Sequence, residues 1–191
     1  MTVNSIRSTR VCPPYIMSNP RSLLDKNNSF GWLSIGLHWF ATFAIILLWF
    51  VGQSISLQSV EQIDARRSLH ITLGLIAWLP LVARIAWRYK SGHPHVNGQT
   101  LLEHRLAKAA HHLMLLVLVV MLISGPLMAW AMPDRNSLSE FAFIFHSNAA
   151  TALAVLVVLH ILAALKHLMF HEDETVARIF VPRKDDAQSE G

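Results

Sequence analysis

The chain has 191 residues, of which 53% are hydrophobic and only 15% are charged, a balance unlike that of a soluble domain of this length. The formal net charge of +4 calls for no nucleic-acid partner, because the aromatic residues lie apart from the basic ones. A single cysteine, Cys12, excludes an internal disulfide, a multi-cysteine iron–sulfur site and covalent cofactor attachment through Cys-x-x-Cys-His.

Residues 1–30 form a polar N-terminal lead. Its apolar part after Arg10 is interrupted by Pro13 and Pro14, which is not typical of a signal peptide, and Met17 is an alternative translation start. No internal repeat is visible as a motif.

Four runs without Asp, Glu, Lys or Arg follow the lead, at residues 27–60, 68–83, 109–133 and 141–165. Each approaches or exceeds the roughly 20 residues of a spanning helix, and the second extends past Arg84. Because the runs lack the alternation of barrel strands, we predict transmembrane helices at about 32–54, 68–90, 109–131 and 143–168. The fold class is therefore an all-α integral membrane four-helix bundle with up-down-up-down topology, covering residues 31–171 and followed by a charged tail at 172–191.

Lysine and arginine predict the orientation of the bundle. Of the 16 basic residues, all but Arg66, Arg67 and Arg135 belong to the lead, to the second connection with its helix ends, or to the tail. The positive-inside rule then places both termini, and the tail, in the cytoplasm.

The chain contains 11 histidines, which fall into two groups by their position relative to the predicted spans. Four are expected to be solvated, namely His93, His95, His104 and His171. The other seven fall within the predicted spans, where ionisable residues are functional candidates by default.

Depth along the antiparallel helices groups four of these histidines into two pairs. His38 and His160 lie at cytoplasmic depth, and His70 and His146 at periplasmic depth. The 14 residues from His146 to His160 advance about 21 Å and complete nearly four turns, so one face of the last helix can serve two stacked sites.

The same 14-residue interval recurs from His70 to Arg84, from His38 to Gly52 and from His111 to Gly125. Arg84 would lie near the cytoplasmic site, where a buried charge needs an anionic partner such as a haem propionate; the alternative is an arginine that reaches the interface. Gly52 would either leave space beside the periplasmic site or serve helix packing.

Haem is the ligand that best suits paired imidazoles here. Zinc would need about four ligands, whereas the predicted spans contain no Asp, Glu or Cys. Haem iron needs two axial ligands and an apolar pocket between helices. We therefore expect two b haems, one held by His38 and His160 and the other by His70 and His146. The alternatives are interhelical hydrogen bonds alone or a haem-free transporter lined by histidines.

Other histidines leave the cytoplasmic pair open. His111 and His112 lie near the cytoplasmic side, so either could replace His38 or His160 as a ligand or act near a substrate. His167, seven residues after His160, is closer to the surface and is a weaker candidate.

Four sequence elements together resemble the bacterial cytochrome b561 family, which is related to the b-type cytochrome subunits of nickel–iron hydrogenases and formate dehydrogenases. They are GLHWF at 36–40, RSLHITLGLIAWLPLVARIAWR at 67–88, HHLMLLVLVVMLISGPLMAW at 111–130 and VLHILAALKHLMFHEDETVARI at 158–179. The resemblance implies a diheme protein, with ligand histidines that match His38, His70, His146 and His160. Its further histidine matches His111, and its small-residue kink matches Gly125 and Pro126.

The resemblance also implies a function. We expect a multi-pass cytochrome of the bacterial inner membrane that moves electrons between its haems and exchanges them with the quinone pool and with a small donor or acceptor or a redox protein. Two axial imidazoles favour electron transfer over oxygen chemistry, so the chain is expected to be an electron-transfer oxidoreductase. His111, His112 and Arg84 are candidates for the quinone site. The alternative is the haem-bearing membrane anchor of a hydrogenase or formate dehydrogenase, and a homodimer stays open.

Overall fold

The structure is a computed structural model that describes Asp25 and residues 31–91, 101–132 and 136–170, apart from the side chains at 101–104, 167, 168 and 170. Four helices make up the described part: α1 (Trp32–Ile55), α2 (Ile63–Ser91), α3 (Leu101–Ala131) and α4 (Ser137–Phe170). The all-α prediction is thus confirmed. The rest of the predicted N-terminal lead and the tail at 172–191 lie outside the described residues.

Three of the helices begin earlier than the charge-free runs predict, by five residues in α2, eight in α3 and six in α4. A charge-free run marks only the length that suits hydrocarbon, whereas a helix continues where water can solvate its charges. Arg67 pairs with Asp64 at 2.9 Å in the first turn of α2. Asn136 caps α4, because its Oδ1 accepts the Ser139 N–H at 3.1 Å.

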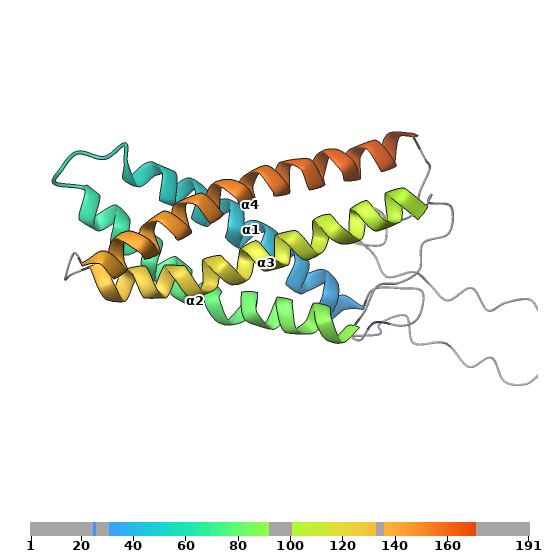
Figure 1. Cartoon of the computed structure of the whole chain (residues 1–191), viewed down its shortest axis with the longest axis horizontal. Coiled ribbons are helices and arrows are strands. Elements are labelled where there is room, and N and C mark those ends of the chain that lie inside the picture. The colour runs from blue at the N-terminus through green and yellow to red at the C-terminus, as the bar shows by residue number, and fades with distance from the viewer. Residues whose placement is uncertain (1–24, 26–30, 92–100, 133–135, 171–191) are drawn as a thin grey trace, which may run out of the picture.

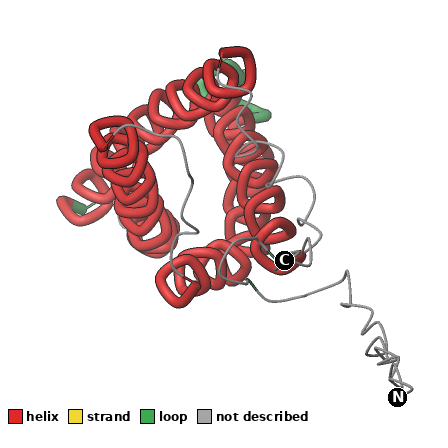
Figure 2. Tube along the Cα trace, turned by 90° about the vertical axis from the view of Figure 1, so that its right-hand side faces the viewer, coloured by secondary structure: helices red, strands yellow, loops and turns green. Residues whose placement is uncertain are grey.

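The helices run antiparallel around a common axis (Figures 1 and 2). The end of α1, the start of α2, the end of α3 and the start of α4 lie together at the left of Figure 1, which we call the short-loop end. The start of α1 and the end of α4 lie at the opposite end, which we call the termini end. Because α1 packs mainly on α2 and α3 mainly on α4, the bundle consists of two helical hairpins.

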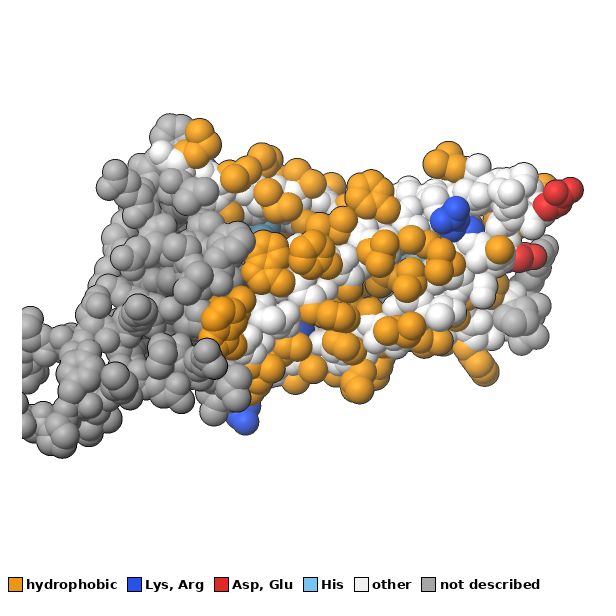
Figure 3. Space-filling view, turned by 180° about the vertical axis from the view of Figure 1, so that it is seen from behind, with side chains coloured by type: hydrophobic (Ala, Val, Ile, Leu, Met, Phe, Trp, Pro, Cys, Tyr) orange, Lys and Arg blue, Asp and Glu red, His pale blue; other side chains and the backbone are white. Residues whose placement is uncertain are grey.

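All four helices are long and apolar enough to cross a membrane. Large hydrophobic side chains such as Phe43, Leu75 and Val155 are exposed along their length. Figure 3 shows one face on which hydrophobic side chains cover the middle of the bundle and most charged side chains lie toward its ends. Such a surface suits lipid, and the chain is a multi-pass membrane protein. Which end faces the cytoplasm stays a prediction.

A small core joins the helices midway along the bundle. It consists of Ala41, Ala77, Leu81, Leu118 and Leu153. Leu153 lies seven residues from both His146 and His160, so the core separates two levels of histidines.

Candidate functional site

His70 of α2 and His146 of α4 meet at the short-loop end. Their ring centroids are 6.2 Å apart and the ring planes are 84° from parallel. A metal–imidazole bond of about 2 Å on each side of one ion would place two ring centres roughly 6 Å apart. The spacing therefore suits two axial ligands of one iron, and the rings predicted to share a depth are in fact neighbours.

A glycine lies against each of these two rings. A Cβ at Gly52 in α1 would stand 3.1 Å from Cε1 and 3.4 Å from Nδ1 of His70. A Cβ at Gly125 in α3 would stand 3.1 Å from Cε1 and 3.5 Å from Nδ1 of His146. Each imidazole thus packs its Cε1–Nδ1 edge against a helix backbone, at a position where a side chain would crowd the ring. This supports the interpretation that Gly52 leaves space beside the site.

The Nδ1 atoms of the two rings differ in their partners. Nδ1 of His146 lies 3.1 Å from the Ser124 hydroxyl of α3. Nδ1 of His70 is one of two buried side-chain nitrogens without a hydrogen-bond partner among the described residues; the other is Nε1 of Trp49. The Leu48 carbonyl interacts with His70, but outside hydrogen-bonding geometry.

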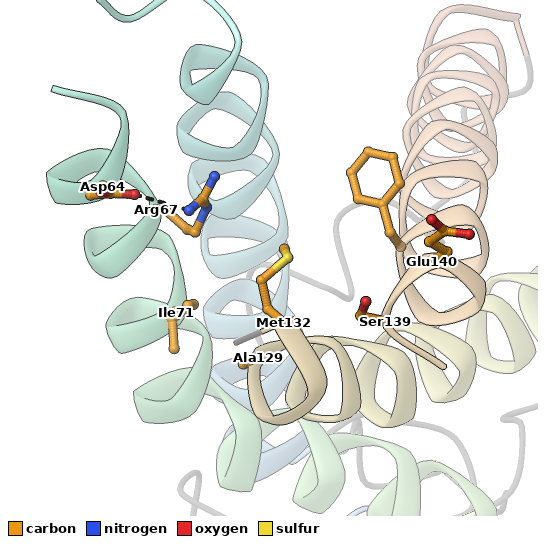
Figure 4. Close-up of a pocket in the computed structure, with 8 residues that line it drawn as sticks. Asp64, Arg67, Ile71, Ala129, Met132, Ser139 and Glu140 are labelled. Atoms are coloured by element: carbon orange, nitrogen blue, oxygen red, sulfur yellow. Dashed lines mark hydrogen bonds and ion pairs between the residues drawn. The ribbon is translucent and has the colours of Figure 1, made fainter. Parts of the chain in front are cut away.

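A cavity of about 720 Å³ opens beside this pair at the short-loop end. Figure 4 shows it between the start of α2, the end of α3 and the start of α4. Its lining includes Ile71, next to His70 in sequence, and Phe143, three residues before His146. Arg67 and Glu140 contribute charges of opposite sign. The site at this end is thus bordered by an open, partly charged recess.

The termini end gathers three histidines and two arginines. The rings of His111 and His160 have centroids 6.4 Å apart, and His38 lies within range of an electrostatic interaction with His160. Arg84 and Arg88, one turn apart on α2, are only 8% and 9% exposed. The structure therefore brings His38, His111 and His160 into one cluster and places Arg84 in it, as the depth argument predicted.

Hydrogen bonds restrict which ring nitrogens in this cluster are free. Nε of Arg88 donates to Nε2 of His111 at 3.2 Å, so that nitrogen is engaged as an acceptor. Nη2 of Arg84 lies 3.4 Å from Nδ1 of His38. Because arginine can only donate, this contact needs the His38 tautomer that carries its proton on Nε2. The two histidines that compete as partners of His160 are therefore both engaged by arginines.

The two further candidates are His112 and His167. His112 is exposed, and its Nδ1 lies 2.7 Å from the Lys108 carbonyl, a bond in which the ring donates. The side chain of His167 lies outside the described residues, as do His93, His95 and His171 and the side chain of His104.

The two hairpins carry their polar residues at corresponding places. The first has His38 and Gly52 on α1 and His70 and Arg84 on α2; the second has His111 and Gly125 on α3 and His146 and His160 on α4. The interval is 14 residues within every helix. The correspondence is one of position and not of motif, which is why no repeat is visible in the sequence. Two glycines thus accompany two histidines at the short-loop end, whereas the termini end has three histidines and Arg84.

The residues at the short-loop end fit a haem with two axial histidines. Two observations carry the fit: the spacing of the rings and the glycine against each ring. Each glycine lies closest to Cε1 and Nδ1 of its ring. The other ring nitrogen, Nε2, is therefore the one that an iron between the two imidazoles would use.

Four apolar spans with histidines gathered between them at two levels define a four-helix membrane protein of the cytochrome type. The chain belongs to the prokaryotic cytochrome b561 family, whose model matches residues 29–182. It is also similar to the protein named cytochrome b561 homolog 2 of Escherichia coli (strain K12), at 27% identity over 179 residues, which are 83% of this chain and 94% of that protein. The family resemblance noted in the sequence is thereby confirmed, and membership implies b-type haem and a role in electron transfer.

Proposed function

We propose that this protein carries electrons across the bacterial inner membrane between two b haems and exchanges them with the quinone pool. The carrying observation is the His70–His146 pair, whose rings stand 6.2 Å apart with a glycine against each, in a chain of the cytochrome b561 family. When bound, haem supplies a one-electron iron couple. Two imidazoles per iron leave no open position, which favours outer-sphere electron transfer over binding of oxygen.

His70 and His146 are the proposed ligands at the short-loop end. Both rings approach the backbone through the Cε1–Nδ1 edge, which leaves Nε2 as the nitrogen that binds the iron. His160 lies 14 residues after His146 and projects from nearly the same face of α4, about 21 Å further along. One helix therefore supplies a ligand to each site, and the order of the sites across the membrane follows from its direction.

His38 and His160 are the proposed ligands at the termini end. His111 lies as close to His160 as a second ligand would, with ring centroids 6.4 Å apart. Its Nε2, however, accepts a hydrogen bond from Arg88, a residue only 9% exposed. Ligation by His111 through Nε2 would break this bond to a buried guanidinium, at a cost of about 1–3 kcal/mol. Ligation by His38 also breaks an arginine contact, that of Arg84 with Nδ1, but this contact is the longer of the two, at 3.4 Å, which favours His38 as the partner of His160.

Arg84 is the proposed partner of a haem propionate. Its contact with Nδ1 of His38 is long, at 3.4 Å, and it requires a proton on the nitrogen with which His38 would bind iron. Ligation by His38 therefore separates the two groups. The guanidinium is only 8% exposed and already lies within electrostatic range of Asp25. Once released from His38, it can turn to a propionate, because a carboxylate can form two hydrogen bonds with it.

The distribution of basic residues supports cytoplasmic termini, so the short-loop end would face the periplasm. The His38–His160 site then lies on the cytoplasmic side, where His111, the exposed His112 and Arg84 provide groups that can exchange protons or bind an anion near a quinone. Electrons would pass between this site and a small donor, acceptor or redox protein at the other face.

Reduction by quinol tests the proposed exchange with the quinone pool. Purified protein in lipid nanodiscs is mixed anaerobically with a short-chain ubiquinol, and the haem α-band is followed by stopped flow. We expect the band to appear, and dithionite-reduced protein to be reoxidised by the matching quinone.

Haem that dithionite reduces but quinol and quinone leave unchanged would contradict the quinone partner. Co-purification of a soluble iron–sulfur subunit, together with haem reduction only through that subunit, would instead support the membrane-anchor role.

A further inference from the structure

We propose that Ser124 is a positioning residue that fixes the tautomer of His146 and thereby lowers the reduction potential of the haem at the short-loop end. The inference rests on the proposed binding of haem between His70 and His146. It assigns a role to a hydroxyl group on α3, a helix that contributes neither of the two proposed ligands at this site.

The hydroxyl of Ser124 has two neighbours that determine its proton. Its Oγ lies 2.7 Å from the Val120 carbonyl and 3.1 Å from Nδ1 of His146, and the residue is only 6% exposed. The Val120 carbonyl can only accept, so the hydroxyl donates to it. The oxygen of Ser124 is then left to accept, and Nδ1 of His146 must carry the proton.

This tautomer is the one that iron ligation needs. A neutral imidazole with its proton on Nδ1 presents a free lone pair on Nε2. In the opposite arrangement the serine hydroxyl would donate to Nδ1. The proton of the neutral ring would then be on Nε2 and would block ligation there. A hydrogen bond from the distal N–H also makes the ligating nitrogen more basic, which stabilises ferric iron and lowers the potential.

Pro126 interrupts the backbone hydrogen bonding of α3 next to Ser124. Pro126 has no N–H, so the Leu122 carbonyl loses its partner within the helix. The indole Nε1 of Trp78 on α2 donates to that carbonyl at 2.9 Å. Ser124 and Gly125 lie between Leu122 and Pro126, and both contact the His146 ring. The bond from Trp78 therefore ties α2 to the segment of α3 that supports this ring.

The other hairpin supplies a natural comparison. Gly52 occupies in α1 the place that Gly125 occupies in α3, and the residue before it is Val51, which has no hydroxyl. The Nδ1 of His70, the ring beside Gly52, has no hydrogen-bond partner among the described residues, although the Leu48 carbonyl interacts with this ring. The two proposed ligands of one haem therefore differ in the group beside the ring: a hydroxyl bonds to His146, whereas the backbone carbonyl of Leu48 interacts with His70. Position 51 offers a place to add a hydroxyl on the His70 side.

Redox titration of purified wild type, Ser124→Ala, Ser124→Thr and Val51→Ser tests the proposal. The haem at the short-loop end is assigned as the component that His146→Ala removes. We expect Ser124→Ala to retain both haems and to shift that component toward the reduced form three- to tenfold, which is about 30 to 59 mV upward for one electron. Ser124→Thr should restore the wild-type value, and Val51→Ser should shift the same component downward.

A merely structural role of Ser124 would change haem content or stability but not one potential selectively. Unchanged potentials in Ser124→Ala with both haems bound would overturn the inference. So would an equal shift of both components, or a failure of Ser124→Thr to restore the value in a variant that keeps both haems. Absence of haem from the wild type would instead refute the proposed function, so the two failures are distinguishable.

Discussion

Replacing His146 with alanine is expected to reduce the haem content from two per chain to one and to leave the other haem spectroscopically unchanged. His146 supplies one of only two axial nitrogens at the short-loop end, and its ring packs 6.2 Å from that of His70. Among the described residues, no third histidine joins this pair, since the corresponding positions on α1 and α3 are Gly52 and Gly125. His70→Ala should therefore have the same effect as His146→Ala.

The haemochrome spectrum, compared with the protein concentration, measures this loss. His112→Ala is the control, because this histidine is exposed and its Nδ1 bonds to the Lys108 carbonyl of its own helix. Two haems of unaltered low-spin spectrum in His146→Ala would show that the pair at the short-loop end does not bind iron.

At the termini end, His38→Ala is expected to remove the second haem, whereas His111→Ala is expected to retain it. Both histidines lie beside His160, but Nε2 of His111 already accepts a hydrogen bond from the buried Arg88 at 3.2 Å. His38 faces Arg84 through Nδ1, and ligation through Nε2 frees that arginine for a propionate. His160→Ala should lose the same haem as His38→Ala.

Haem content and low-temperature spectra of the three variants decide between the two candidates. Loss of haem in His111→Ala, with retention in His38→Ala, would replace the proposed pair by His111 and His160. In that case the bond between Arg88 and His111 would be lost, and Arg84 could keep its contact with His38.

Much of the fold follows from the sequence, because a run without charges is both the requirement for a spanning helix and easy to recognise. The starts of α2, α3 and α4 were predicted too late, since their first turns carry solvated charges such as Asp64 and Arg67 that interrupt the runs without ending the helices. Orientation in the membrane rests on the count of basic residues alone.

The sequence predicted the depth of each candidate histidine along the helices, but not which histidines face one another across the bundle. Helical rise places His70 level with His146 from spacing alone. Which rings face one another across the bundle depends on how the hairpins pack, so spacing could not separate His38 from His111. The role of Ser124 was missed because it depends on the rotamer of a hydroxyl group. Its only sequence signal is the run of Ser124, Gly125 and Pro126 at the predicted kink.

The number of haems per wild-type chain tests the central claim most directly. Protein purified from a haem-sufficient host is assayed by pyridine haemochrome against amino-acid analysis, with acid–acetone extraction to establish that the haem is not covalently bound. Two extractable b haems per chain, both low-spin with paired imidazoles, are predicted. Folded protein that contains no haem, or a single haem that persists in both His146→Ala and His160→Ala, would contradict the account.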